Sequence, residues 1–174
     1  RTPARLAVAD SSGQQLTAEE LFLAALRFSR QLESLPAKAI GILLPPGVQG
    51  TLANMAALLS GKTVVNLDPS LPEQSFSHCL RQAKIDTILT NREHLEKSGL
   101  EERIREVTLL YVEDPRALLR GSAVERALIR LLPVFLLRFI LSLRFEPEVT
   151  AAIIFVPRHE PLPLGVRLGH SNII

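Results

Sequence analysis

The chain has 174 residues, of which 47% are apolar, and a net charge of +2. This length corresponds to about one domain, with enough apolar residues for a buried core. Mixed charges and few aromatic residues exclude a dedicated nucleic-acid binder, which presents a basic face with aromatic side chains for stacking. Cys79 is the only cysteine, so neither an internal disulfide framework nor a zinc site made of cysteines can form. A reducing compartment such as the cytoplasm is therefore expected.

Strands and helices are expected to alternate along the first two thirds of the chain. Apolar runs predict strands at residues 6–9, 14–16, 39–44, 63–67, 85–89 and 107–112. Helical spacing and capping signals predict helices at residues 17–35, 48–60, 70–83, 92–97 and 100–105. Because βαβ units bury both faces of a parallel sheet, this order predicts an α/β fold. We expect a mostly parallel sheet with helices on both faces, in a single subdomain over residues 1–174.

Two helix starts carry a hydroxyl and a carboxylate three positions apart, which is the spacing of a capping box. Thr17 and Glu20 form the first pair, and Ser70 and Glu73 form the second. Asp68 precedes the second pair at the end of a predicted strand, where parallel sheets present ligand-binding residues. Helix capping is favoured over ligand binding for this stretch.

Residues 122–145 break the alternation with a long helical segment rich in Leu, Ile, Val and Phe. Its arginines and Pro133 exclude a membrane-spanning run. Arginines among large apolar residues suit a helix at a membrane surface, here the inner face of the membrane. The predicted lipid contacts are Arg130, Phe135, Leu136, Arg138 and Phe139. The alternatives are a helix packed over the domain, or one whose apolar face is covered by a part of the protein outside this sequence.

The closing stretch has the layout of a phosphate-binding loop. Residues 151–156 predict a buried strand, a proline-rich loop follows, and residues 165–168 lead into a helix start at 170–172. Such a loop needs glycines and hydroxyls, because backbone N–H groups must converge on an anion. Those residue types are missing where the loop should be. The stretch is a nucleotide site, a degenerate one or a simple connection.

Four upstream segments resemble the adenylate-forming (AMP-binding) superfamily of acyl-CoA and acyl-carrier-protein ligases. They are residues 16–21, 41–46, 56–62 and 65–69. Residues 61–67 and the Leu- and Arg-rich segment are most similar to the 2-acylglycerophosphoethanolamine acyltransferase/acyl-acyl-carrier-protein synthetase type. The resemblance implies the N-terminal part of an enzyme that uses Mg-ATP to convert a fatty acid into an acyl-adenylate. Such an enzyme then passes the acyl group to a thiol.

The family's phosphate loop can be set on the closing stretch residue by residue. The hydroxyl and glycine positions of that loop are held by Val156, Pro157, Arg158, His159, Glu160 and Pro161. The frame and tail of the motif are matched by Phe155, Pro163, Gly165, Val166, His170 and Asn172. Leu164 stands at the lysine position. Because proline has no N–H to donate and Val156 has no hydroxyl, we interpret the loop as degenerate.

The family's adenine pocket, metal-binding Glu and ribose-binding Asp lie downstream of this loop and are absent from the sequence. The chain alone is therefore predicted to be non-catalytic and to hold no cofactor, although the family uses ATP and magnesium. The predicted partner is the remainder of the ligase or a C-terminal domain. His78, His94, His159 and His170 show no ligand spacing, so no metal site is predicted. The alternative hypothesis is a non-catalytic α/β module that binds a partner or a membrane.

Overall fold

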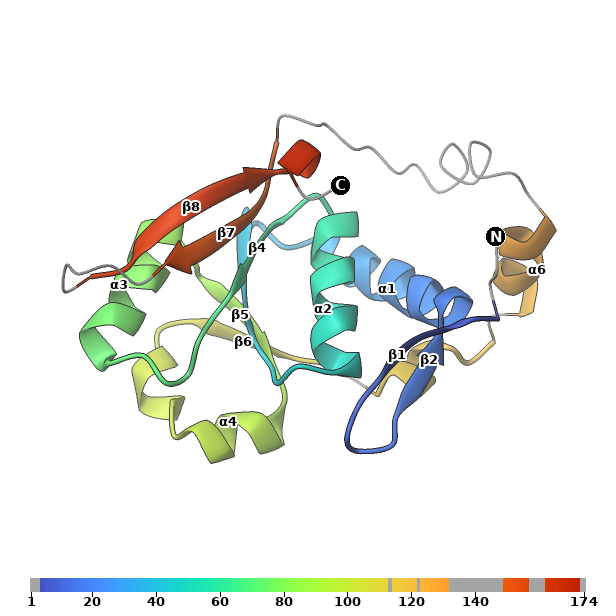
Figure 1. Cartoon of the computed structure of the whole chain (residues 1–174), viewed down its shortest axis with the longest axis horizontal. Coiled ribbons are helices and arrows are strands. Elements are labelled where there is room, and N and C mark those ends of the chain that lie inside the picture. The colour runs from blue at the N-terminus through green and yellow to red at the C-terminus, as the bar shows by residue number, and fades with distance from the viewer. Residues whose placement is uncertain (1–3, 113, 122, 132–148, 157–161, 173–174) are drawn as a thin grey trace. The chain divides into compact units, whose positions relative to one another are not determined.

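The computed structural model describes residues 4–112, 114–121, 123–131, 149–156 and 162–172 (Figure 1). The chain forms two compact units, which we call the helical unit and the sheet unit. The helical unit comprises Arg1–Ser34, Pro46–Gly61 and Glu113–Phe145, and the sheet unit comprises Leu35–Pro45, Lys62–Val112 and Glu146–Ile174. The single subdomain expected for residues 1–174 stays a prediction. Among the described residues, every helix is too short or too polar to cross a membrane.

The helical unit combines a small hairpin with packed helices. Its described elements are β1 (Leu6–Ala9), β2 (Gln15–Thr17), α1 (Ala18–Glu33), α2 (Val48–Leu59), α5 (Pro115–Leu118) and α6 (Ala123–Leu131). β1 and β2 pair antiparallel, with Val8 opposite Leu16. α1 and α2 lie side by side. Ala24 of α1 and Ala53 and Ala56 of α2 are fully buried, and such small residues allow two helices to approach closely.

The two long helices of this unit begin with different caps. Thr17 starts α1 with the predicted capping box: the Glu20 N–H donates to Thr17 Oγ1 at 3.3 Å, and the Thr17 N–H donates to Glu20 Oε2 at 3.0 Å. The N-cap of α2 is Gly47, which has no side chain to cap with. The Val48 N–H donates instead to Asp10 Oδ2 at 3.3 Å. A Cβ at Gly47 would lie 3.0 Å from Asp10 Cβ, so glycine allows this approach.

The sheet unit is built on strands in the order β6-β5-β3-β4-β7-β8. Their bounds are β3 (Ala39–Leu43), β4 (Thr63–Asn66), β5 (Thr87–Thr90), β6 (Thr108–Tyr111), β7 (Thr150–Val156) and β8 (Leu164–Gly169). Neighbouring strands pair parallel from β6 through to β7, and β8 pairs antiparallel with β7. The helical segments of this unit are α3 (Glu73–Ala83), α4 (Arg92–Ser98) and the 3-10 helices η1 (Glu101–Ile104) and η2 (His170–Asn172). The expected α/β fold, with a mostly parallel sheet and helices, is confirmed.

The core of the sheet unit surrounds β3, whose residues are all buried. Gly41 in this strand leaves room for its neighbours: a Cβ there would lie 2.9 Å from Leu67 Cδ1 and 3.0 Å from Ile88 Cγ1. Phe76 of α3 and Leu95 of α4 belong to the same buried cluster. The continuous apolar runs of the sequence therefore mark strands of a buried sheet, as expected.

Two predicted local features are wrong. Ser70 does not cap α3, because its N–H and hydroxyl donate to Asp68 Oδ1 at 2.8 and 2.7 Å. Asp68 thus closes a local turn, which competes with helix capping for the hydroxyl. α3 begins after Pro72 without a side-chain cap. The helix expected at residues 100–105 is the shorter 3-10 helix η1.

The helical segment expected at residues 122–145 is described only in its first part. α6 covers Ala123–Leu131, and residues 132–145 lie outside the described residues. Of the predicted lipid contacts, Arg130 lies in α6, whereas Phe135, Leu136, Arg138 and Phe139 fall in the part that is not described. The membrane-surface role stays a prediction.

Candidate nucleotide-loop hairpin

The candidate loop joins the two antiparallel strands β7 and β8. β7 is anchored in the parallel sheet by pairing with β4, where Ala152 lies opposite Val64. The loop leaves the carboxyl end of β7, the end at which parallel α/β sheets bind ligands. Residues 165–168 lead into a helical turn, η2, as expected. The sequence did not show that they form the strand β8, which pairs along β7 with Gly165 opposite Phe155.

Part of the predicted loop cannot be placed. Residues 157–161 lie outside the described residues. They are Pro157, Arg158, His159, Glu160 and Pro161, so the degenerate character of this part stays a prediction.

The two residues that flank the loop are described and are apolar. Val156 and Leu164 lie opposite each other at the end of the hairpin. Their exposed fractions are 43% and 37%, so both side chains are accessible to solvent. Neither offers a hydroxyl or a cation to a triphosphate. The described flanks of the loop therefore do not fit ATP and magnesium.

The strand before the loop is less buried than its apolar sequence suggests. Ala151 is buried, but Ile154 is 50% exposed. Ile153 and Phe155 point to the other face of β7, where they pack against the buried cluster. The prediction of a buried strand at residues 151–156 is therefore only half right. The reason is that one face of the hairpin meets the core and the other has no cover among the described residues of the sheet unit.

Gly165 has a structural reason to be glycine. A Cβ at this position would lie 3.1 Å from Phe155 Cε1 and 3.2 Å from Ile153 Cγ2. The preceding Pro163 is buried. Gly165 and Pro163, which both match the family motif, are therefore explained by packing of the hairpin against its neighbours. The motif alone does not reveal this packing.

The tail of the motif lies at the far end of β8. His170 and Asn172 belong to η2, and the six residues of β8 separate them from the loop by about 20 Å of extended chain. The Gly169 N–H donates to Asn172 Oδ1 at 2.9 Å. Asn172 therefore closes the turn after β8, and the structure does not bring the tail and the loop flanks together.

Other reactive side chains belong to the packing of the sheet unit. Cys79 is buried, and burial raises the pKa of its thiol above the ordinary value of 9.0, which disfavours the nucleophilic thiolate. His94 follows Asn91, whose Oδ1 accepts its N–H at 2.6 Å. Burial and then Lys97 lower the pKa of His94. The described part of the chain contains no group of three His, Cys, Asp or Glu side chains that could hold a metal ion.

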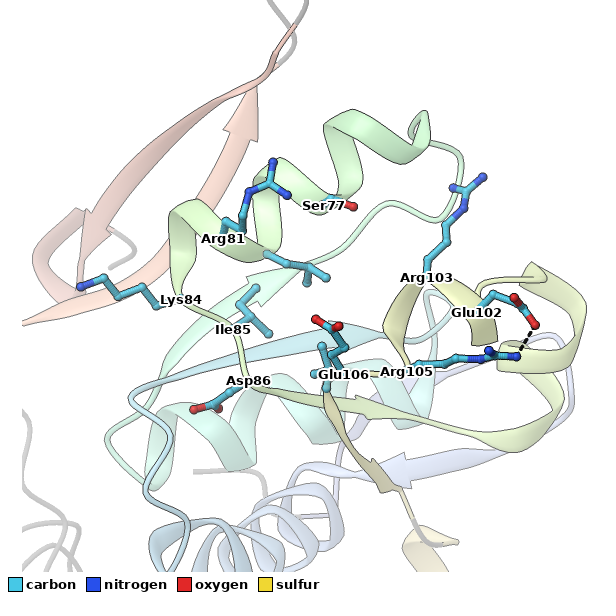
Figure 2. A pocket seen from close by; sticks show the side chains of 11 residues that line it. Ser77, Arg81, Lys84, Ile85, Asp86, Glu102, Arg103, Arg105 and Glu106 are labelled. Atoms are coloured by element: carbon cyan, nitrogen blue, oxygen red, sulfur yellow. Dashed lines mark hydrogen bonds and ion pairs between the residues drawn. The ribbon is translucent and has the colours of Figure 1, made fainter.

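A polar hollow that sequence reasoning missed lies between α3 and η1 (Figure 2). Its volume is about 670 Å³. Its charged lining consists of Arg81, Lys84, Asp86, Glu102, Arg103, Arg105 and Glu106. Arg105 and Glu102 form an ion pair with each other. The sequence shows these charges but not their convergence, because they come from separate elements.

The fold and the hairpin together define an α/β domain with a candidate ligand loop at the carboxyl end of its sheet. A family model described as AMP-binding enzyme matches residues 1–155. The chain therefore belongs to the AMP-binding enzyme family, the adenylate-forming superfamily that its sequence resembles. The narrower acyl-acyl-carrier-protein synthetase type stays a prediction.

Known proteins are similar to this chain over part of their own length. The structure of VinN with 3-methylaspartate has a TM-score of 0.69 at 21% identity, covering 97% of this chain and 44% of VinN. The Mycobacterium tuberculosis fatty acyl CoA synthetase has a TM-score of 0.68 at 16% identity, covering 97% of this chain and 32% of the synthetase. The hybrid PKS-NRPS synthetase pyvA of Aspergillus violaceofuscus (strain CBS 115571) is 27% identical over 94 residues, which are 52% of this chain and 2% of that protein. The chain spans less than half the length of each relative.

Proposed function

We propose that this chain is the N-terminal part of an ATP-dependent ligase that activates a fatty acid as an acyl-adenylate and passes the acyl group to a thiol. The observation that carries the proposal is the β7–β8 hairpin. It stands at the carboxyl end of the parallel sheet, in a chain that the AMP-binding family matches over residues 1–155. The partner that would supply the rest of the active site is the remainder of the ligase or a C-terminal domain.

The fatty-acid substrate rests on the resemblance of residues 61–67 and of the Leu- and Arg-rich segment. The similar proteins differ in what their names mention: one is a fatty acyl CoA synthetase, and another was solved with 3-methylaspartate. Both names are compatible with activation of a carboxylic acid. With ATP and magnesium, the complete protein that contains this chain should release pyrophosphate in the presence of a fatty acid, and AMP once a thiol acceptor is added. Release with an amino acid such as 3-methylaspartate in its place would contradict the fatty-acid assignment.

The chain alone is proposed not to bind ATP, because Val156 and Leu164 flank the loop with apolar, exposed side chains. Calorimetric titration of the chain with ATP and magnesium should show no detectable binding. Leu164→Lys restores the cation at the lysine position and should give measurable, magnesium-dependent binding, because ionised donors bind phosphate more strongly than neutral ones.

Leu162→Lys is the matched control for this titration, because Leu162 is also exposed beside the loop but lies outside the lysine position. An equal gain in both variants would mean that added charge alone attracts the nucleotide. Tight magnesium-dependent binding by the unchanged chain would refute the degenerate-loop interpretation.

A further inference from the structure

The hollow between α3 and η1 has a volume and lining residues that suit a small polar ligand. Its volume of about 670 Å³ falls within the range of about 300–1,000 Å³ that is usual for ligand sites. Leu80, Ile85 and Val107 are its apolar lining residues. The rest of the lining is polar or charged, which disfavours an acyl chain and favours a charged ligand.

Positive charge on one side of this hollow has no ion-pair partner among the described residues. The side chains of Arg81 and Lys84 make no hydrogen bond or ion pair with other described residues. Arg103 donates from Nη1 to the Leu71 carbonyl oxygen at 3.2 Å. This bond orients the guanidinium of Arg103 toward the start of α3 without cancelling its charge.

Apart from the Glu102–Arg105 ion pair, the charges of the hollow lie on two sides. Figure 2 shows Arg81 and Arg103 on the same side, with Ser77 between them. Asp86 and Glu106 lie on the opposite side, toward the strands. An anion is attracted to the first side and repelled from the second, so the arrangement gives the ligand one orientation.

We propose that Arg81, Arg103 and Ser77 bind the phosphate group of a small phosphorylated metabolite. Two guanidinium forks and a hydroxyl are suited to phosphate oxygens, because guanidinium groups donate paired hydrogen bonds to such anions. The carboxylates of Asp86 and Glu106 then face the remainder of the ligand, which fits a body with hydroxyl or amine groups.

The carboxylate side of this phosphate site lies away from the nucleotide-loop hairpin, whereas Ser77 and Arg81 also line a second hollow together with Leu162, beside the loop. Asp86 and Glu106 precede the amino ends of β5 and β6, whereas the loop follows the carboxyl end of β7. In a parallel sheet these ends lie at opposite edges. The site uses no loop residue and stands whether or not the chain binds ATP.

The test is a nuclear magnetic resonance titration of the whole chain with inorganic phosphate and with glycerol 3-phosphate at low ionic strength. Saturable shifts should concentrate in α3 and η1, and the hydroxylated monoester should bind more tightly than free phosphate. Arg81→Ala and Arg103→Ala should each weaken binding about tenfold, the equivalent of one lost charge-assisted bond. Both side chains are exposed, so the fold should persist.

Lys38→Ala is the matched control, since it removes one exposed positive charge from the sheet unit outside the hollow. It should leave binding unchanged. Glu106→Gln should strengthen phosphate binding, because it removes a repelling carboxylate. No saturable binding, or equal weakening by Lys38→Ala and Arg81→Ala, would overturn the proposal. Tighter binding of free phosphate than of the monoester would overturn the assignment to a metabolite.

Discussion

At the scale of single residues, matches to a family motif can have structural rather than ligand-binding reasons. Gly165 is the clearest case, because its missing Cβ makes room for the ring of Phe155 and the side chain of Ile153. Asn172 is another, since its side chain accepts the Gly169 N–H. The match of these two residues to the motif is therefore explained by contacts within this chain.

Gly165→Ala should therefore destabilise the chain even in the absence of nucleotide. The added Cβ falls 3.1 and 3.2 Å from two packed side chains, and overpacking of this kind costs about 1–3 kcal/mol. Urea unfolding measures the loss of unfolding free energy. Val166→Ala, at a neighbouring half-exposed position, should cost less. Equal stability of Gly165→Ala and the parent chain would contradict the structural role.

At the scale of elements, Arg27 of α1 binds the segment after residue 113 through three contacts. Arg27 donates from Nη1 to the carbonyl oxygens of Leu118 and Arg120 at 2.8 and 2.6 Å. Its Nη2 forms an ion pair with Glu125 Oε1 at 2.8 Å. Because the side chain of Arg27 is only 24% exposed, these bonds are better shielded from water than those of a surface pair. α5 and α6 thus share the Arg27 anchor, and Arg126 of α6 adds longer ion pairs to Glu19 and Glu20 of α1 at 3.9 and 3.8 Å.

Arg27→Gln should release this anchor and lower the unfolding free energy by about 2 kcal/mol, as expected for hydrogen bonds to a charged group. Hydrogen exchange should accelerate in α5 and α6 and remain unchanged in β3. Gln31→Ala is the control, because Gln31 is an exposed, uncharged residue on the same helix. The anchor would be ruled out by unchanged exchange in α5 and α6.

At the scale of the whole molecule, stability should fall in acid. The Thr17 N–H lowers the pKa of Glu20 below its ordinary value of 4.5, and the Arg27 guanidinium lowers the pKa of Glu125. A carboxyl whose pKa is lower in the folded state binds fewer protons there than in the unfolded state. The stabilisation is therefore complete above about pH 4.5 and is lost as the pH falls through the lowered values.

Urea unfolding between neutral pH and pH 3 should show this decline. The double variant Glu20→Gln, Glu125→Gln should be less stable at neutral pH and show a shallower dependence on pH. Glu33→Gln serves as a control, since Glu33 is exposed at the end of α1. A parallel dependence in the double variant would mean that other groups dominate the acid response.

Local signals in the sequence were sufficient to predict most helices and strands of this protein, and also the family to which it belongs. Apolar runs alternating with helical segments indicated the parallel sheet, and Thr17 and Glu20 marked the start of α1 through contacts three residues apart. The same capping signal gave a wrong prediction at Ser70, because Ser70 donates its hydrogen bonds to Asp68 instead of capping α3.

Tertiary structure decided the features that depend on residues far apart in the chain. The cap of α2 comes from Asp10, 38 residues before Val48. The anchor of α5 and α6 comes from Arg27, and the charged hollow unites α3, η1 and the starts of two strands. The half-exposure of β7 also depends on what covers each face of the sheet. Periodicity and capping describe neighbours along the chain, so they predict where elements begin and end but not which distant side chains meet.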